Sequence, residues 1–570
     1  MKRKIYISFI LFFFIVTGII SQPVIEWEKS FGGNNQDVGY KSLLTSDYLF
    51  MATSGANGGD VSGNHGGFDF WIFNTDSSGN IQWQKNVGGT GQDVLENGIR
   101  TFDFGYIFIG RTTSNNLDVS GNHGSDDNWL VKTDSMGNIL WQKCFGGSLS
   151  EYSHVNNVIQ LPDSGYIISG TTESIDGDVT FNNGTKDTWI IKTDKNGILI
   201  WQKCYGGTSE EYGNCIIPTL DGGFIIASDG SSINGDMSGL HGGIDAWIVK
   251  IDYLGTIQWQ KCFGGTSTEF NTSIIQTNDG GFVIVSATRS NDGDVSGNHG
   301  ESDIWLAKLN SNGIIQWQKC YGGTAADWSN GFYQTSDQGF IIVGGTVSND
   351  GDVNGNHGGW DWWAIKTDSI GNLQWQKCFG GSLDEEAYSV TETPERGYII
   401  TGYSYSNDGD VTNHHGSTSY TDCWVVKLAS DTTLICSPLN NSLTNGNQNA
   451  IEFSSVSFSI TILGTAPTFQ WEELIPGGFW QPLISGGNVV GAESSILTLN
   501  NCNLLQNNNQ YRCIVSNSCP SSLTSTPQTL TVSSACIPVS GGATNGNQSV
   551  ITPASATFTV SVLGTSPAYQ

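Results

Sequence analysis

The stretch DIWLAKLNSNGIIQWQKCYGG, residues Asp303–Gly323, decides the fold of this chain. Its two halves alternate apolar and polar side chains with the two-residue period of β-strands, and a turn sequence, Asn310-Ser-Asn-Gly313, separates them. The tryptophan of its second half recurs at intervals of 56, 58, 60, 58, 58 and 58 residues, as Trp27, Trp83, Trp141, Trp201, Trp259, Trp317 and Trp375. Such a constant period predicts a repeat architecture.

One unit of the repeat resolves into four short strands. In the fifth unit we expect these strands at Thr272–Thr277, Phe282–Ala287, Asp303–Leu309 and Ile314–Cys320, with a long loop over 289–302 between the second and third. Glycine and Asx turns separate the other strands. Seven antiparallel units of four strands predict an all-β fold, a seven-bladed β-propeller.

The two ends of the repeat region complement each other. The region begins with a single segment, Ile25–Lys29, whose sequence matches the fourth strand of the repeat. The seventh unit, from Trp375 to about Leu434, lacks a fourth strand. We therefore expect the N-terminal strand to complete the last blade, which would close the ring and remove an exposed sheet edge.

The unit also resembles a known repeat. The segment from Asp303 to Gly313, followed by Cys320-Tyr-Gly-Gly323 and by Asp337–Gly345, resembles the SBBP-type β-propeller repeat of secreted and surface proteins from Bacteroidetes-type bacteria. The resemblance covers about residues 25–430. It implies an extracellular location and often type IX secretion through a C-terminal sorting domain, and it implies no established catalytic residues.

The net charge and the N-terminal sequence indicate where the protein is located and which partners it does not bind. The formal net charge of −29 argues against binding of nucleic acid or of an anionic membrane, because both need a cationic surface. Three cationic residues, Lys2, Arg3 and Lys4, precede a largely apolar run over 5–20, which predicts a secretory signal peptide at 1–21. The alternative is an uncleaved anchor. We expect an exported mature chain without a membrane span and with the propeller at 22–434.

The composition changes after the repeats. Residues 435–535 resemble an immunoglobulin-type (Ig-like) β-sandwich, with Trp471 on one inner strand and Tyr511-Arg-Cys513 on another. Phe458 stands in the region where a partner cysteine is expected ahead of Trp471. Residues 536–570 repeat 436–470 at an offset of one hundred, so we interpret them as the start of a second such module.

The cysteines fall into two groups. One group has a fixed place in the repeat and is predicted to consist of buried free thiols: Cys144, Cys204, Cys262, Cys320 and Cys378. The other group lies beyond the repeats, where disulfides are plausible in an exported protein. Cys513–Cys519 together with Cys436–Cys502 is one of three possible pairings.

The long loops carry a pattern of oxygen ligands. Four units have oxygen-bearing side chains at positions 1, 3, 5 and 12 of a calcium loop, and each of them has glycine at position 6. The residues at these positions are Asp292, Asp294, Ser296 and Asp303; Asp350, Asp352, Asn354 and Asp361; Asn234, Asp236, Ser238 and Asp245; and Asn116, Asp118, Ser120 and Asp127. They predict Ca²⁺ binding. The alternative is a loop held by Asx turns.

Other repeated side chains have structural interpretations. A third-strand tryptophan in each unit is expected to pack between blades, although it could also serve as a carbohydrate platform: Trp71, Trp129, Trp189, Trp247, Trp305, Trp363 and Trp424. Trp328, Trp360 and Trp362 lie outside this pattern and are candidates for exposed contacts. A histidine recurs in the long loop of most units, and we expect it to make a structural hydrogen bond rather than to bind zinc.

These patterns favour binding over catalysis. We expect a secreted or surface binding, adhesion or scaffold protein whose acidic long loops form one rim and contact an extracellular glycan or protein. The alternative is an extracellular carbohydrate-active enzyme, which needs a specific pair of carboxylates. We interpret two acidic doublets, Glu210-Glu211 and Glu385-Glu386, as solvated loop residues.

Overall fold

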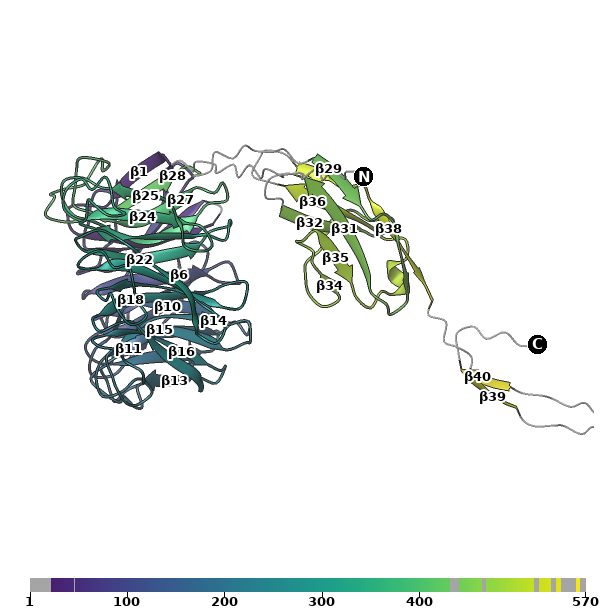
Figure 1. Cartoon of the computed structure of the whole chain (residues 1–570), viewed down its shortest axis with the longest axis horizontal. Coiled ribbons are helices and arrows are strands. Elements are labelled where there is room, and N and C mark those ends of the chain that lie inside the picture. Colours follow the sequence, from purple (N-terminus) through teal and green to yellow (C-terminus); the bar gives the residue numbers. More distant parts are fainter. Residues whose placement is uncertain are drawn as a thin grey trace, which may run out of the picture. The chain divides into compact units, whose positions relative to one another are not determined.

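The computed structural model of the chain describes residues 22–45, 47–430, 440–463, 468–516, 522–534, 540–544 and 560–563 (Figure 1). The chain divides into two compact units, Met1–Thr433 and Leu434–Gln570. The predicted signal segment, 1–21, lies outside the described residues. In the part that is described, no helix has the length and apolar character needed to cross a membrane.

Within the described residues, the first unit contains seven four-stranded antiparallel sheets, named here sheets 1 to 7. Sheet 1 consists of β2 (Asp37–Leu44), β3 (Tyr48–Ser54), β4 (Asp69–Thr75) and β5 (Ile81–Val87). Sheet 2 consists of β6 (Asp93–Arg100), β7 (Tyr106–Thr112), β8 (Asp127–Thr133) and β9 (Ile139–Phe145). Sheet 3 consists of β10 (Glu151–Gln160), β11 (Tyr166–Thr172), β12 (Asp187–Thr193) and β13 (Leu199–Tyr205).

The remaining sheets repeat this order. Sheet 4 consists of β14 (Glu211–Pro218), β15 (Phe224–Gly230), β16 (Asp245–Ile251) and β17 (Ile257–Phe263). Sheet 5 consists of β18 (Glu269–Gln276), β19 (Phe282–Thr288), β20 (Asp303–Leu309) and β21 (Ile315–Tyr321). Sheet 6 consists of β22 (Asp327–Gln334), β23 (Phe340–Thr346), β24 (Asp361–Thr367) and β25 (Leu373–Phe379). Sheet 7 consists of β26 (Glu385–Glu392), β27 (Tyr398–Ser404), β28 (Asp422–Leu428) and β1 (Ile25–Phe31).

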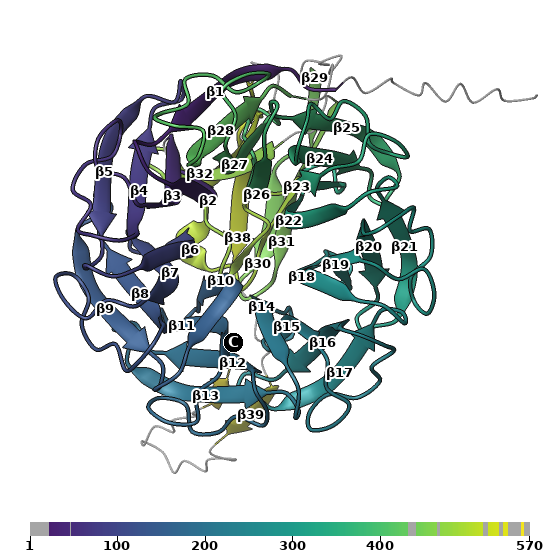
Figure 2. The ribbon, with the colours of Figure 1, turned by 90° about the vertical axis from the view of Figure 1, so that its left-hand side faces the viewer.

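The seven sheets lie around a ring like the blades of a propeller (Figure 2). The first strand of each sheet lies inside the ring and the fourth strand lies outside. Sheet 7 takes its fourth strand from the start of the chain, because β1 pairs antiparallel with β28, with Lys29 opposite Val425. The prediction that the N-terminal strand completes the last sheet is confirmed.

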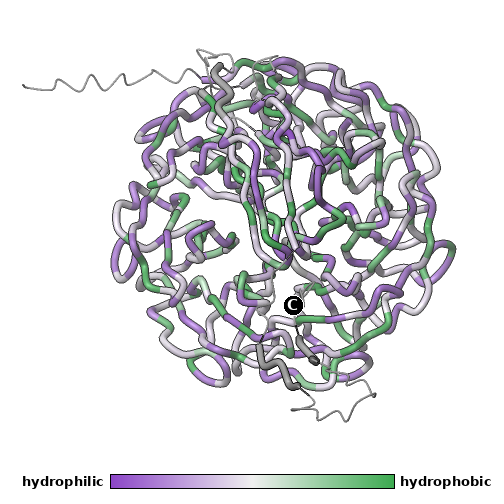
Figure 3. Tube along the Cα trace, turned by 90° about the vertical axis from the view of Figure 1, so that its right-hand side faces the viewer, coloured by the Kyte–Doolittle hydropathy of each residue, from purple (hydrophilic) through white to green (hydrophobic). Residues whose placement is uncertain are grey.

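The core of this unit lies between neighbouring sheets. The third-strand tryptophans are 0% exposed, which confirms that they pack in the core: Trp71, Trp129, Trp189, Trp247, Trp305, Trp363 and Trp424. Six fourth-strand tryptophans, all except Trp375, lie over a glycine in the next sheet. At Gly313, for example, a methyl group would lie 3.2 Å from the Trp259 ring. Along the trace, hydrophobic stretches in the strands alternate with hydrophilic stretches that are prominent in the projecting loops (Figure 3).

In the described residues of the second unit, two sheets form a sandwich-like core and one strand pair follows further on. One sheet consists of β29 (Asn440–Thr444), β31 (Val456–Leu463), β35 (Ile496–Leu499) and β34 (Val489–Val490). The other consists of β30 (Gln448–Ile451), β38 (Gln528–Ser533), β36 (Gln510–Ser516), β32 (Thr468–Leu474), β33 (Gln481–Pro482) and β37 (Ser522–Thr524). A 3₁₀ turn, η1 (Leu504–Gln506), precedes β36, and β39 (Ser540–Thr544) pairs with β40 (Val560–Leu563).

The core of the second unit is aromatic. Trp471 is fully buried, and the Phe458 ring lies 6.3 Å from it and 4.8 Å from the Tyr511 ring. Cys513 is buried in the same cluster. The predicted partners Cys436 and Cys519 lie outside the described residues, so both disulfides stay predictions. Most of the predicted second module, 536–570, also lies outside them.

Candidate functional site

The long loops hold neighbouring sheets together. In sheet 5, the Asp292 carboxylate accepts hydrogen bonds from the backbone N–H of Thr266, 2.7 Å away, and from its hydroxyl. Thr266 belongs to the link between sheets 4 and 5. Asp350, Asn234 and Asn116 make the equivalent bond to Thr324, Thr208 and Thr90. The first position of each predicted calcium loop therefore fastens the loop to the segment before its own sheet.

The other predicted calcium ligands have separate partners. The third-position carboxylates approach a glycine N–H at 3.3–3.4 Å, in Asp118, Asp236, Asp294 and Asp352. At the fifth position, a fourth-strand glutamine donates to Ser120, Ser238 and Ser296 and to the backbone of Asn354. The twelfth-position aspartates, Asp127, Asp245, Asp303 and Asp361, accept from a histidine. Among the described residues, no three His, Cys, Asp or Glu side chains are grouped to hold a metal. Calcium binding stays a prediction.

The repeated histidine makes the predicted hydrogen bond. In six sheets its Nδ1 lies 2.6–2.8 Å from the aspartate that begins the third strand, in the pairs His65–Asp69, His123–Asp127, His241–Asp245, His299–Asp303, His357–Asp361 and His415–Asp422. Sheet 3 has Asn183 instead, whose backbone N–H donates to Asp187. The structural interpretation of these histidines is confirmed.

Each boundary between sheets buries two carboxylates beside one glycine. At Gly206, a methyl group would lie 2.4 Å from Glu211 Oε2 and 2.5 Å from Asp187 Oδ1. The same arrangement occurs around the ring in the pairs Asp422/Asp37, Asp69/Asp93, Asp127/Glu151, Asp187/Glu211, Asp245/Glu269, Asp303/Asp327 and Asp361/Glu385. In every pair, Oδ1 of the first residue is buried without a hydrogen-bond partner in the described structure. Such groups are costly to bury in the charged form.

Burial raises the pKa of several of these acids. It raises the pKa of Asp37 and Asp187 to about 7 and that of Asp327 to about 6. Hydrogen bonds oppose the rise; for Asp187 the opposing bond is the backbone N–H of Asn183, whereas the Glu211 carboxylate adds to the rise. In sheets 1, 2, 4, 5 and 6 the imidazole supplies a second hydrogen bond that opposes the rise in pKa, as His241 does for Asp245.

The interpretation of the acidic doublets as solvated was wrong for one member of each. Glu211 and Glu385 are 0% exposed, because each begins a first strand and accepts a hydrogen bond from the preceding Gly-Gly backbone, at Gly207 and Gly381. A sequence signal was present. The spacing Gly-Gly-x-x-x-Asp or Gly-Gly-x-x-x-Glu occurs at all seven boundaries, starting at Gly32, Gly88, Gly146, Gly206, Gly264, Gly322 and Gly380.

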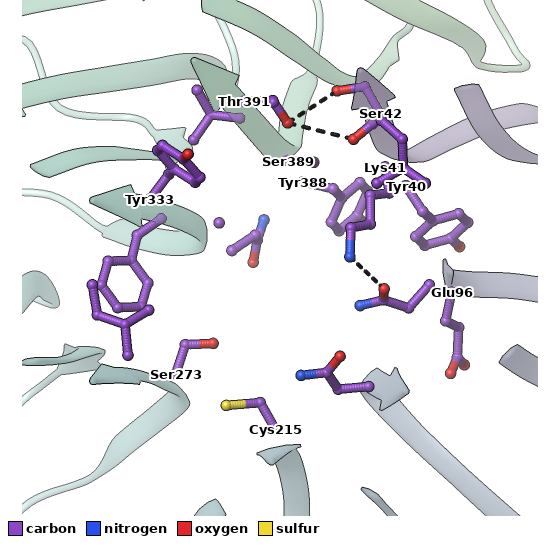
Figure 4. Close-up of a pocket in the computed structure, with 18 of the residues that line it drawn as sticks. Tyr40, Lys41, Ser42, Glu96, Cys215, Ser273, Tyr333, Tyr388, Ser389 and Thr391 are labelled. Atoms are coloured by element: carbon purple, nitrogen blue, oxygen red, sulfur yellow. Dashed lines mark hydrogen bonds between the residues drawn. The ribbon is translucent and has the colours of Figure 1, made fainter. Parts of the chain in front are cut away.

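A cavity of about 450 Å³ lies at the centre of the ring (Figure 4). It is lined by residues from the first strand of every sheet. These residues come from the middle and the end of the strands, for example Tyr40–Leu44 of β2 and Tyr388–Glu392 of β26. The cavity therefore lies toward the hairpin turns, away from the rim of long loops that the sequence favoured.

A β-bulge in each first strand gives the cavity its side chains. Pairing between the first and second strands shifts register after the third residue of the first strand in five sheets, and after the second residue in sheets 3 and 5. A bulge leaves one residue unpaired and redirects its side chain. Tyr40, Glu96, Asn330 and Tyr388 are bulge residues that line the cavity. Sequence periodicity gives no signal for a bulge, so these residues were not predicted.

Different sides of the cavity are lined by chemically different side chains. The rings of Tyr40 and Tyr388 stack 5.1 Å apart, and Lys41 Nζ donates to Asn97 Oδ1 at 2.6 Å. Burial lowers the pKa of Lys41 to about 8. The Glu96 carboxylate lies 3.8 Å from Arg111 Nε. One side of the cavity thus offers an aromatic pair, an amine and a carboxylate, whereas Ser273 and Cys215 line another side (Figure 4).

Comparisons with known proteins give little beyond the all-β class. No protein-family model and no curated protein matches the chain. A solved structure of BBS1N in complex with ARL6DN matches with 8% identity and a TM-score of 0.30, over 56% of this chain and 92% of that one. Puromycin hydrolase matches with 8% identity and a TM-score of 0.32, over 68% of this chain and 59% of that one. A Dscam structure matches with 12% identity and a TM-score of 0.16, over 55% and 60%. At these values, the similarities carry no argument about function.

Proposed function

We propose that the chain is a secreted or cell-surface protein that binds an extracellular glycan or protein without catalysis, as an adhesion or scaffold protein. Its parts would be a closed seven-bladed β-propeller and an Ig-like sandwich. One observation carries the proposal: the buried tryptophans and carboxylates repeat in all seven sheets, whereas the residues lining the central cavity differ between them. Repetition suffices to build a ring, but recognition needs a few specifically placed groups in a concave site.

The ligand of the cavity can be found with an array of glycans and extracellular proteins. For a ligand that binds, we expect Lys41→Ala and Tyr388→Ala each to weaken the affinity about tenfold or more, because both line the cavity. Lys319→Ala is the matched control, since it removes the same charge from an exposed position of β21. Equal affinities for all three variants and the parent would contradict binding in the cavity.

A second candidate rests on two carboxylates. Glu96 and Glu392 both line the cavity, and a glycoside hydrolase needs a pair of acids. Release of reducing sugar from any member of a polysaccharide panel, lost in Glu96→Gln, would favour this carbohydrate-active enzyme over a binding protein.

Calcium is proposed as a stabiliser of the long loops. If it binds there, millimolar Ca²⁺ should raise the melting temperature of residues 22–434 by several degrees relative to EDTA, since a ligand of the folded state stabilises it. Asp292→Asn with Asp294→Asn should reduce the shift. Equal midpoints in both solutions, with no metal found by native mass spectrometry, would exclude calcium.

A further inference from the structure

Two tryptophans outside the repeat pattern form a pair on the long-loop side of sheet 6. Trp328 is the second residue of β22 and Trp360 immediately precedes β24. Their ring centroids lie 3.7 Å apart with an interplanar angle of 27°, and both side chains are half-buried. The third candidate, Trp362, is only 1% exposed, so the prediction of an exposed contact was wrong for it. Trp362 instead packs against Trp424.

A glycine makes room for the pair. Gly345 lies opposite Trp328 in the sheet, and a methyl group there would lie 3.2 Å from the Trp360 ring and 3.3 Å from Trp328 Nε1. The equivalent second-strand position holds a side chain in each of the other sheets, namely Thr53, Arg111, Thr171, Asp229, Ala287 and Tyr403. Among the seven sheets, only sheet 6 has a glycine at this position, where any side chain would press against the two indoles.

The pair is held by a carboxylate of the next sheet. Glu386 Oε1 accepts from Trp328 Nε1 at 2.9 Å and from Asn330 Nδ2 at 2.8 Å, while its Oε2 accepts from the Tyr403 hydroxyl at 3.0 Å. The polar edge of the Trp328 indole is thus already bonded. What remains for a ligand is aromatic surface, whose face carries the negative part of the ring quadrupole.

The equivalent place in sheet 3 is occupied by a cation of the chain itself. Lys186 precedes β12 as Trp360 precedes β24. Its Nζ lies 5.7 Å from the ring centre of Tyr152, which has the strand position of Trp328, and 4.9 Å from that of Tyr212. Glu210 Oε1 lies 3.3 Å from the same ammonium. The same ammonium donates to the Tyr212 hydroxyl at 3.0 Å, so this site of sheet 3 holds the cation with two aromatic rings, a hydroxyl and a carboxylate.

Sheet 5 shows the same preference. The Arg289 guanidinium lies 5.5 Å from the ring centre of Phe270, which also has the strand position of Trp328. In sheet 6, by contrast, no lysine or arginine of the described residues lies over Trp328 or Trp360. The chain therefore supplies a cation to the aromatic residue at this strand position in sheets 3, 4 and 5, with Lys186 serving both Tyr152 and Tyr212, and supplies none to Trp328 within the described residues.

The surroundings of the tryptophan pair suit a positive charge. A surface cavity of about 370 Å³ is lined by Gly359, Asp384 and Tyr405, among others. Neither tryptophan lines this cavity, but Trp360 directly follows Gly359 and is hydrogen-bonded to Asp384. Asp384 precedes β26 as Glu210 precedes β14, and its Oδ1 accepts from the backbone N–H of Trp360 at 3.0 Å. The net charge of −29 attracts cations at long range.

We propose that the Trp328–Trp360 pair and Asp384 bind a lysine or arginine side chain from a basic segment of a partner protein. The inference rests on the proposed binding function and names the class of partner at the rim. The aromatic faces attract the cation, the Asp384 carboxylate pairs with it, and the partner's charge takes the place that Lys186 holds in sheet 3.

Fluorescence anisotropy with a labelled peptide of alternating lysine and glycine tests this. We expect Trp328→Ala to weaken the affinity about tenfold and Trp328→Phe to retain most of it. Trp360→Lys should act like Trp328→Ala, because it places an ammonium where sheet 3 has Lys186. Ile244→Lys is the matched control, because it adds the same charge at the equivalent position before β16 and should change the affinity less than about twofold.

Several results would overturn the proposal. Equal losses in Trp360→Lys and Ile244→Lys would show that only bulk charge matters. Equal binding of a peptide with acetylated lysines, or competition by a neutral oligosaccharide, would show that the pair binds something other than a cation. If the peptide fails to bind while a ligand of the central cavity depends on Lys41, only this inference fails. If neither site binds anything, the proposed function fails too.

Discussion

Removal of residues 22–31 should destabilise the ring by more than about 4 kcal/mol, or leave it unable to stay monomeric. The segment contains β1, whose loss would expose the whole edge of β28. Phe31 is buried, with its ring 4.9 Å from Phe73 of sheet 1, so the strand joins sheet 7 to sheet 1. Glu28 also accepts from Trp424 Nε1 at 2.8 Å. Urea denaturation and size-exclusion chromatography of the shortened chain measure the effect.

Rescue in trans separates loss of the strand from general damage. A synthetic peptide with the sequence of residues 22–31 should pair with the open edge and restore both stability and the monomer, because an exposed edge accepts a matching strand. The same peptide with Phe31→Asp should not, since the buried contact with Phe73 would be lost. A shortened chain as stable as the parent, without added peptide, would show that ring closure contributes nothing.

The second large effect is a fall in stability as the pH rises from about 4 to 7. The pKa of Asp187 is about 7 in the folded state, above its ordinary value of 3.8. The folded protein therefore binds more protons than the unfolded chain between these values, so this stabilisation is complete at low pH and disappears as pH rises through the folded-state pKa. Asp187→Asn should thus raise stability at pH 8 by about 1–2 kcal/mol and flatten the pH profile.

Two variants control this experiment. Asp252→Asn changes the same charge in an exposed turn where sheet 5 already has Asn310, and it should leave the profile unchanged. Asn183→His supplies the imidazole that six other sheets use, so it should lower the pKa of Asp187 and reduce the loss of stability near pH 6. Thermal melting from pH 5 to 8 measures both. A parent protein whose stability is constant or rises over this range would contradict the raised pKa values of the buried pairs.

Much of the repeat unit could be predicted from sequence because its signals are local. Period-two alternation predicted Asp303–Leu309 as a strand with the bounds observed for β20. The isolated fourth-strand segment at Ile25–Lys29 predicted the pairing of β1 with β28. The repeated histidines and cysteines were also placed correctly, since a residue with one place in every unit has one environment: the free cysteines of the repeat are buried or half-buried.

The sequence by itself determined the second and third strands of the unit, the order of the sheets and the strand that completes the last one, because strand period and turn residues act over a few neighbouring positions. The first strand of the fifth unit, expected from Thr272, begins earlier, at Glu269. Only the tertiary structure decided which acids are buried, which bulge residues line the cavity and where two tryptophans stack. Each of these depends on a neighbour from another strand or sheet: Asp187 meets Glu211, Tyr40 meets Tyr388, and Trp328 needs the empty space at Gly345. Burial and contact arise between segments that are distant in sequence. The Gly-Gly-x-x-x-Asp or Gly-Gly-x-x-x-Glu spacing marks one acid of each pair, but no local pattern encodes which side chains meet.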